Sequence, residues 1–235
     1  MDTGNLKKGR FYGVSVGPGD PELLTLKAVR CLERCPVLVA PQTASGRMLA
    51  LDIARGAADL RGKIILPLHF AMSRDSEVLK ASHAAAADAV RAHLDAGRDV
   101  ALLNLGDVSI YATYGYLEEI LTAQGYAAVR IAGVPSFCAA AARLGQSLTG
   151  GMEQPLTIAP GRHVDQVLAA PGAKVLMKTG RRLPKTLDAL RERGLLANSA
   201  MVCNCGLPDE AVFPALTDYD PAQDAGYFAT ILVKE

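Results

Sequence analysis

The stretch GVSVGPGDP, residues 13–21, joins an apolar run to a glycine turn and then to the start of a helix. Residues 11–16 have the apolar character of a buried strand, and glycine permits the sharp turn that follows. The Asp-Pro pair at the end suits the N-cap and first position of a helix expected to reach about Arg34. This order predicts an α/β fold that opens with a strand–turn–helix unit.

The same alternation continues through the first half of the chain. Further strands are expected at 36–41, 63–66, 99–105 and 127–131, and further helices at 48–60, 76–96, 111–124 and 137–144. Strands that alternate with helices predict a parallel sheet with right-handed crossovers. Residues 1–150 are therefore interpreted as an N-terminal α/β domain with a parallel five-stranded sheet.

The second half of the chain has a different pattern. Strands are expected near 156–159, 174–179, 200–203, 211–214 and 227–234, with helices only at 164–169 and 184–193. A segment rich in Gly, Ser and Thr, residues 145–155, is the expected linker. Residues 151–235 are therefore interpreted as a C-terminal α/β domain with a smaller mixed sheet.

Composition narrows the class of protein. Of 235 residues, 50% are hydrophobic and 21% are charged, which is enough apolar material for a sizeable core. The 25 basic side chains nearly balance the 24 acidic ones, and this balance does not favour a nucleic-acid binder. No apolar run approaches the roughly 18 residues of a membrane span, and the charged N-terminus precedes no signal-peptide core. We expect a cytoplasmic protein with no nucleic-acid or membrane partner.

Cysteine and histidine show no metal-binding pattern. The 5 cysteines are odd in number and form no paired C-x-x-C array, and the 4 histidines are scattered. We expect reduced thiols and no metal.

Three glycine turns follow expected strands, at Gly17, Gly106 and Gly133. Because the carboxyl ends of parallel strands meet at one edge of a sheet, these turns should face one cleft. Their spacing matches neither G-x-G-x-x-G nor G-x-x-x-x-G-K-[ST], so a dinucleotide or a nucleotide phosphate is not favoured. Ser136 follows the third turn and is expected to cap the next helix.

Several basic side chains follow strand ends rather than helix faces. Guanidinium groups suit carboxylates, so a small polyanion is one interpretation and ordinary solvated charge is the other. The set consists of Arg47, His69, Arg74, Lys80, Arg162, His163, Lys178, Arg181 and Arg182.

Three motifs together resemble those of the tetrapyrrole methylases. The opening GVSVGPGDPELLTLKA (13–28), then GDVSIY (106–111) and GVPSF (133–137), are similar to the family's motifs in order and spacing over nearly the whole chain. The resemblance implies an S-adenosyl-L-methionine-dependent methyltransferase with two α/β domains and a cofactor cleft between them. It also implies a homodimer.

The resemblance implies a set of site residues. Cofactor contacts are expected at Pro18, Gly106, Asp107, Val108, Ser109, Ile110, Ser136, Phe137, Met177, Asn204, Cys205, Gly206, Ala229 and Thr230. Asp107 is the nearest carboxylate for a catalytic role, with a structural role in its turn as the alternative. Contacts to substrate carboxylates are expected from Arg47, Arg74, Arg181 and Arg182.

The resemblance further implies the reaction. Segments 41–54, 68–75, 107–116 and 227–233 are similar to the branch that methylates ring carbon 20 of precorrin-2, or of its cobalt form, in cobalamin synthesis. The loop at 69–75 departs from the usual pattern of that branch, and His83 stands where an aromatic residue is expected. The alternatives are another member of the family, such as a uroporphyrinogen III methyltransferase, and a carrier that binds a tetrapyrrole without turnover.

Overall fold

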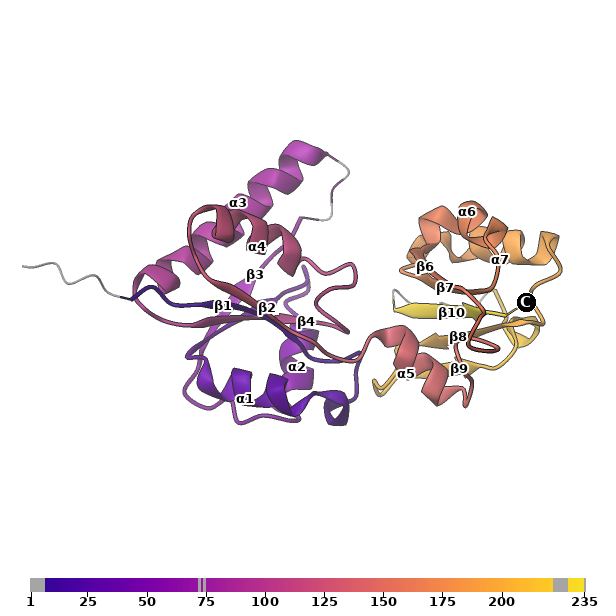
Figure 1. Ribbon diagram of the computed structural model, residues 1–235, viewed down its shortest axis with the longest axis horizontal. Helices are drawn as coiled ribbons and strands as arrows, with labels where there is room; N and C mark the ends of the chain where they lie inside the picture. The colour runs from indigo at the N-terminus through magenta and orange to yellow at the C-terminus, as the bar shows by residue number, and fades with distance from the viewer. Residues whose placement is uncertain (1–6, 72, 74, 222–227, 235) are drawn as a thin grey trace, which may run out of the picture. The chain divides into compact units, whose positions relative to one another are not determined.

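The computed structural model describes residues 7–71, 73, 75–221 and 228–234, and of Arg181 only the backbone. Backbone contacts divide the chain into two compact units, Met1–Val134 and Pro135–Glu235, each built on one five-stranded sheet (Figure 1). This arrangement of two sheets with flanking helices confirms the expected α/β class.

The first sheet is parallel throughout, as expected. Its strands are β1 (Phe11–Ser15), β2 (Val37–Pro41), β3 (Ile64–Leu68), β4 (Val100–Asn104) and β5 (Ala128–Ile131), in the spatial order β3-β2-β4-β1-β5. Strands β1 and β4 are buried along their whole length, which explains their continuous apolar sequences.

Helices cover both faces of this sheet (Figure 1). On one face lie α1 (Leu26–Arg34) and α2 (Leu49–Arg55), and on the other α3 (Ser76–Asp95) and α4 (Tyr114–Ala123). The ring of Tyr114 is fully buried and stacks on Phe11, with centroids 4.9 Å apart. These apolar contacts anchor α4 to β1 and so position the turn that precedes α4.

The first helix begins later than the sequence predicts. Asp20 caps as expected, accepting from the backbone of Glu22 at 2.8 Å, but it starts only the 3-10 turn η1 (Pro21–Leu23). Leu24 and Thr25 are extended, and the Thr25 hydroxyl then accepts from Ala28 N at 3.1 Å. A second N-cap thus starts α1 at residue 26. The predicted helices 48–60 and 111–124 are also shorter in the structure.

The second sheet is mixed, as expected. Its strands are β6 (Leu156–Pro160), β7 (Ala173–Met177), β8 (Ser199–Cys203), β9 (Ala211–Phe213) and β10 (Ala229–Val233), in the order β6-β7-β10-β8-β9. Only β6 and β7 pair in parallel, and the other pairings are antiparallel.

Helices also cover both faces of the second sheet. Helices α6 (Val164–Ala169) and α7 (Leu183–Glu192) lie on one face, and α5 (Ser136–Arg143) lies on the other (Figure 1). Short 3-10 turns complete the unit: η2 (Gly161–His163), η3 (Gly180–Arg182) and η4 (Leu216–Asp218). No helix among the described residues is both long and apolar enough to cross a membrane.

The contact boundary differs from the division expected at residue 150. Helix α5 packs against β10 and β8, so backbone contacts divide the chain between Val134 and Pro135. The α5 segment follows β5 without a composition change, and only its packing reveals which sheet it joins. As a division into folding domains, 1–150 and 151–235 stays a prediction.

Candidate active site

One group of expected site residues lies in the first unit, where β1 and β4 end. These neighbouring strands lead to α1 and α4, which lie on opposite faces of the sheet, so the connections diverge there. Ligands of open parallel sheets bind in the crevice formed at such a divergence. Gly106 N donates to Gly17 O at 2.8 Å, and both glycines have positive φ, 68° and 73°. The first and second glycine turns are therefore joined directly.

The Asp107 carboxylate holds the second turn to the third. Its Oδ1 accepts from the backbone and the hydroxyl of Ser109, and its Oδ2 accepts from Gly133 N at 2.7 Å. Burial opposes ionisation of Asp107, but these hydrogen bonds and the charge of Arg130 outweigh it and lower the pKa. Both oxygens of an ionised Asp107 are thus engaged inside the turns.

Ser15 is a site residue that sequence reasoning missed. Its side chain is fully buried, donates to Ile131 O at 2.7 Å and accepts from Val108 N at 2.8 Å. A Cβ on Gly133 would lie 2.4 Å from Ser15 Cβ, so only glycine permits this close approach. The available signal was a polar residue ending an otherwise apolar strand.

The structure brings the residues of the first unit that are expected to contact the cofactor to this edge. Pro18 is half-buried in the first turn and Val108 is buried, whereas Ser109 is exposed and Ile110 is half-buried. Arg47 is exposed in the turn after β2, where its carbonyl accepts from Thr43 N at 2.9 Å. Arg74 lies outside the described residues.

The second-unit residues also share one edge. β6, β7 and β8 end there and β10 begins there, so Thr230 pairs with Met177 and Ala229 pairs with Cys203. The Thr230 hydroxyl lies 3.4 Å from that of Ser136. The expected capping role of Ser136 is wrong, because Pro135 is the N-cap and the Ser136 hydroxyl makes no capping bond. Phe137 is buried one residue further along α5.

The turn after β8 is held by a carboxylate that sequence reasoning missed. Glu210 accepts from Gly206 N at 2.9 Å and from Arg143 Nε. Burial opposes ionisation of Glu210, but the bonds from Arg143 and Gly206 lower its pKa. Asn204 has φ 51° and donates to Asp209 at 2.9 Å, and the adjacent Cys205 is buried. Glu210 therefore stabilises this turn as Asp107 stabilises the turns of the first unit, because in both places a carboxylate accepts hydrogen bonds from backbone N–H groups.

The expected substrate arginines of this unit lie after β7. Arg182 is exposed, and its backbone N–H donates to Thr179 O at 2.8 Å in η3. The backbone of Arg181 lies in the same turn, and its side chain is outside the described part of the chain. Both positions share an edge with Met177.

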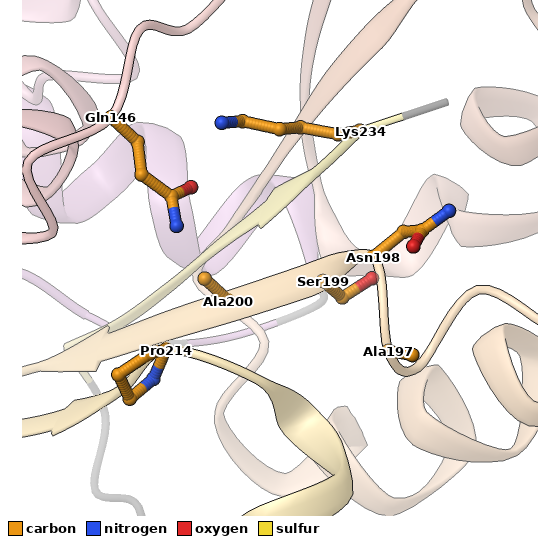
Figure 2. Close-up of a pocket in the computed structure, with 7 residues that line it drawn as sticks. All are labelled: Gln146, Ala197, Asn198, Ser199, Ala200, Pro214 and Lys234. Atoms are coloured by element: carbon orange, nitrogen blue, oxygen red, sulfur yellow. The ribbon is translucent and has the colours of Figure 1, made fainter.

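A separate pocket lies at the opposite edge of the second sheet. It has a volume of about 310 Å³ and contains Lys234, which follows the carboxyl end of β10 (Figure 2). Its other lining residues are Gln146, Ala197, Asn198, Ser199, Ala200 and Pro214. None of the expected cofactor residues lines this pocket.

The described residues contain no group of three or more His, Cys, Asp or Glu side chains that could hold a metal ion. Cys31 and Cys35 approach to 3.9 Å between their sulfur atoms, and both are buried free thiols.

Fold and site together define an α/β protein with two sheets and glycine turns at the carboxyl ends of its parallel strands. The chain belongs to the Tetrapyrrole (Corrin/Porphyrin) Methylases, whose family model matches residues 10–218. It is therefore a methyltransferase by class, as the three motifs predict.

Two curated relatives match nearly the whole chain. The cobalt-precorrin-2 C(20)-methyltransferase of Salmonella typhimurium is 31% identical, with 97% of each chain covered. The precorrin-2 C(20)-methyltransferase of a Sinorhizobium species is 34% identical, with 96% of this chain and 95% of the relative covered.

Solved structures show the same fold. The uroporphyrin-III-C-methyltransferase of Thermus thermophilus is 25% identical with a TM-score of 0.71, covering 96% of this chain and 92% of that one. A cobalt precorrin-4 methyltransferase has a TM-score of 0.74 at 20% identity, and the alignment covers 96% of this chain and 94% of that one. A complex of the Thermus thermophilus enzyme with S-adenosyl homocysteine has a TM-score of 0.68 at 22% identity, and the alignment covers 97% of this chain and 92% of that one.

Proposed function

We propose that this protein transfers a methyl group from S-adenosylmethionine to carbon 20 of precorrin-2, or of cobalt-precorrin-2, in cobalamin biosynthesis. The observation that carries the proposal is the full-length similarity to two relatives named as C(20)-methyltransferases. The joined glycine turns in the first unit support it, since they form the expected ligand-binding edge of a parallel sheet.

The proposed cofactor residues fit S-adenosylmethionine chemically. Most of them are apolar or neutral, which suits an adenosine group, and the one charged member is Asp107. An ionised carboxylate near the site favours a sulfonium cation and opposes a phosphate. We assign Met177, Asn204, Cys205, Gly206, Ala229 and Thr230 to the adenosine portion, Pro18 and residues 106–110 to the methionine portion, and Ser136 and Phe137 to neighbouring contacts.

The cofactor supplies an electrophilic methyl group, and the protein has to align it with the attacking carbon. An electron-rich, enamine-like ring carbon would attack this methyl group without prior deprotonation. The sulfur–methyl bond would break as the carbon–methyl bond forms, S-adenosyl homocysteine would leave, and the proton of the methylated carbon would be lost afterwards to water. Alignment alone can lower a barrier by about 7–11 kcal/mol. Asp107 serves this alignment by holding its turn, because its oxygens already accept from Ser109 and Gly133. A role for Asp107 as base is therefore not favoured by its contacts.

We assign the substrate carboxylates to Arg47, Arg74, Arg181 and Arg182. Charge reversal at Arg181 is expected to raise the KM for the tetrapyrrole with little change in cofactor affinity. An unchanged KM would remove Arg181 from this role.

The test of the function is a single turnover under nitrogen with precorrin-2 and methyl-labelled S-adenosylmethionine. We expect a product heavier by one methyl group, with the label on carbon 20 by NMR. A label on another ring carbon would identify a different tetrapyrrole methylase, and bound but unmodified substrate would identify a carrier. A parallel reaction with the cobalt complex of precorrin-2 shows whether the substrate carries the metal.

We also propose that the protein is a homodimer and lies in the cytoplasm, as the family resemblance and the sequence lead us to expect. Light scattering tests the homodimer, and cell fractionation tests the location.

A further inference from the structure

Three aromatic rings gather on the α3–α4 side of the first unit. His83 of α3 stacks on Tyr116 of α4, with ring centroids 4.5 Å apart and 10° between the ring planes. Phe70, in the loop after β3, lies 6.4 Å from the His83 ring at an angle of 50°. These three residues, Phe70, His83 and Tyr116, form what we call the aromatic platform.

The aromatic platform lies toward the carboxyl edge of the first sheet. Phe70 follows the end of β3, and Tyr116 is in the first turn of α4, which follows the glycine turn after β4. Helix α3 has 20 residues and is about 30 Å long, whereas a strand of 5 residues spans about 17 Å. The buried side chains of α3 begin at Ala86, so the half that carries His83 is packed less fully than the half that follows. The platform therefore stands at the edge that carries the cofactor turns.

The ring of Tyr116 is oriented but exposed. His83 stacks on it, yet 56% of Tyr116 remains accessible. Ala71 N donates to Ser82 Oγ at 3.1 Å, which fastens the segment carrying Phe70 to α3. Burial lowers the pKa of His83, which favours the neutral form of its imidazole ring. An exposed aromatic face that is supported from behind by a second ring suits the stacking of a flat ligand.

A second exposed tyrosine lies beside the cofactor turn. Tyr111, between that turn and α4, is 44% exposed and has φ 50°. Bulky residues rarely occupy this left-handed region, and strained residues cluster at functional sites. Tyr111 therefore adds another aromatic side chain to the same edge.

We propose that the aromatic platform binds a conjugated pyrrole unit of the tetrapyrrole substrate by stacking, with Tyr116 in contact and His83 as its positioning residue. This inference rests on the proposed function. The substrate combines flat conjugated rings with acidic arms, and Arg47 is exposed in the turn after β2, at the same edge. An aromatic face and a nearby cation complement those two features.

The direct test is the affinity of Tyr116 variants for precorrin-2. Titration under nitrogen, with S-adenosyl homocysteine replacing the methyl donor, measures binding without turnover. Tyr116→Leu keeps an apolar side chain but removes the ring, and the Kd for precorrin-2 should rise roughly three- to tenfold. Tyr116→Phe keeps the ring and should bind like the wild type. The Kd for S-adenosyl homocysteine should be unchanged in both variants.

The positioning role of His83 has its own readout. His83→Leu removes the ring beneath Tyr116 and should weaken precorrin-2 binding less than Tyr116→Leu does. His83→Phe restores a ring and should restore the affinity. In the double variant the two effects should not add, because His83 acts only through Tyr116. Additive effects would show that His83 has no positioning role.

A matched control comes from the other edge of the sheet. Ile64 is the first residue of β3 and is 44% exposed, so Ile64→Ala removes exposed apolar surface away from the platform. Its affinity for precorrin-2 should be unchanged. A wild-type Kd for Tyr116→Leu, or an equal loss in Ile64→Ala, would overturn the proposal. If Tyr116→Leu does not fold, the two His83 variants decide.

The same titration separates this inference from the proposed function. A wild-type protein that neither binds nor methylates precorrin-2 refutes the function itself. A wild-type protein that does both, with an unaffected Tyr116→Leu variant, refutes only the aromatic platform.

Discussion

Replacing Asp107 by Asn tests whether this side chain orders the glycine turns that are proposed to hold the cofactor. The substitution preserves size and leaves one carbonyl oxygen, so the amide cannot accept from both Ser109 and Gly133, whose N–H groups lie at 2.8 and 2.7 Å. With Asp107 8% exposed, water replaces the lost acceptor poorly. Losing one hydrogen bond to a charged group costs about 1.5–3 kcal/mol.

That cost should appear both in stability and in cofactor binding. If the substitution destabilises the ordered conformation of the turns by about 2 kcal/mol, the fraction of protein able to bind the cofactor falls by up to about thirtyfold. We therefore expect the calorimetric Kd of S-adenosyl homocysteine to rise, by up to about thirtyfold, together with a lower urea midpoint. Asp59→Asn makes the same charge change at an exposed carboxylate that pairs with Arg61, so it should leave the Kd unchanged and lower the urea midpoint less than Asp107→Asn does.

The stabilisation that Asp107 gives to the folded state depends on pH. Because the folded state lowers the pKa of Asp107, its stabilisation is present above the unfolded pKa of about 3.9 and is lost as pH falls through the lower folded value. The stability difference between wild type and Asp107→Asn should thus be constant near neutral pH and shrink in acid.

An Asp107→Asn variant that binds S-adenosyl homocysteine with wild-type affinity would refute this reasoning.

Three further predictions follow from the contacts. Gly133→Ala places a Cβ 2.4 Å from Ser15 Cβ and should lower the free energy of unfolding by about 1–3 kcal/mol in urea titrations, and a neutral result would contradict the close approach. Glu210→Gln weakens the acceptor of Gly206 N and should raise the Kd of S-adenosyl homocysteine severalfold without changing the KM for precorrin-2. Arg47→Glu should have the opposite profile, a higher KM for precorrin-2 with an unchanged cofactor Kd, and a changed cofactor Kd alone would argue against its role.

Sequence patterns predicted most of the elements because the determinants are local. Apolar runs of five or six residues followed by glycine identify β1 and β4, and helical periodicity identifies α3 and α7. The start of α1 was missed because Asp20 and Thr25 are both good N-caps, and the extended backbone at Leu24 favours the second.

The candidate residues could be found from motifs, but not the contacts that hold them. Ser15 bonds across 116 positions to Ile131 and across 93 positions to Val108, and no local pattern records such pairs. Gly206 and Glu210, which form a hydrogen bond, are near one another in the sequence. Arg143, which donates to the same Glu210 carboxylate, is 67 positions away from it.

By itself, therefore, the sequence determined the family, the two kinds of sheet and the positions of the glycine turns. These follow from side-chain periodicity and from backbone conformations that few residue types permit. Only the tertiary structure decided that α5 packs with the second sheet, that Asp107 is engaged within its turns and that His83 stacks on Tyr116. Such features depend on hydrogen bonds and ring contacts between distant segments, and these form only when folding brings the segments together.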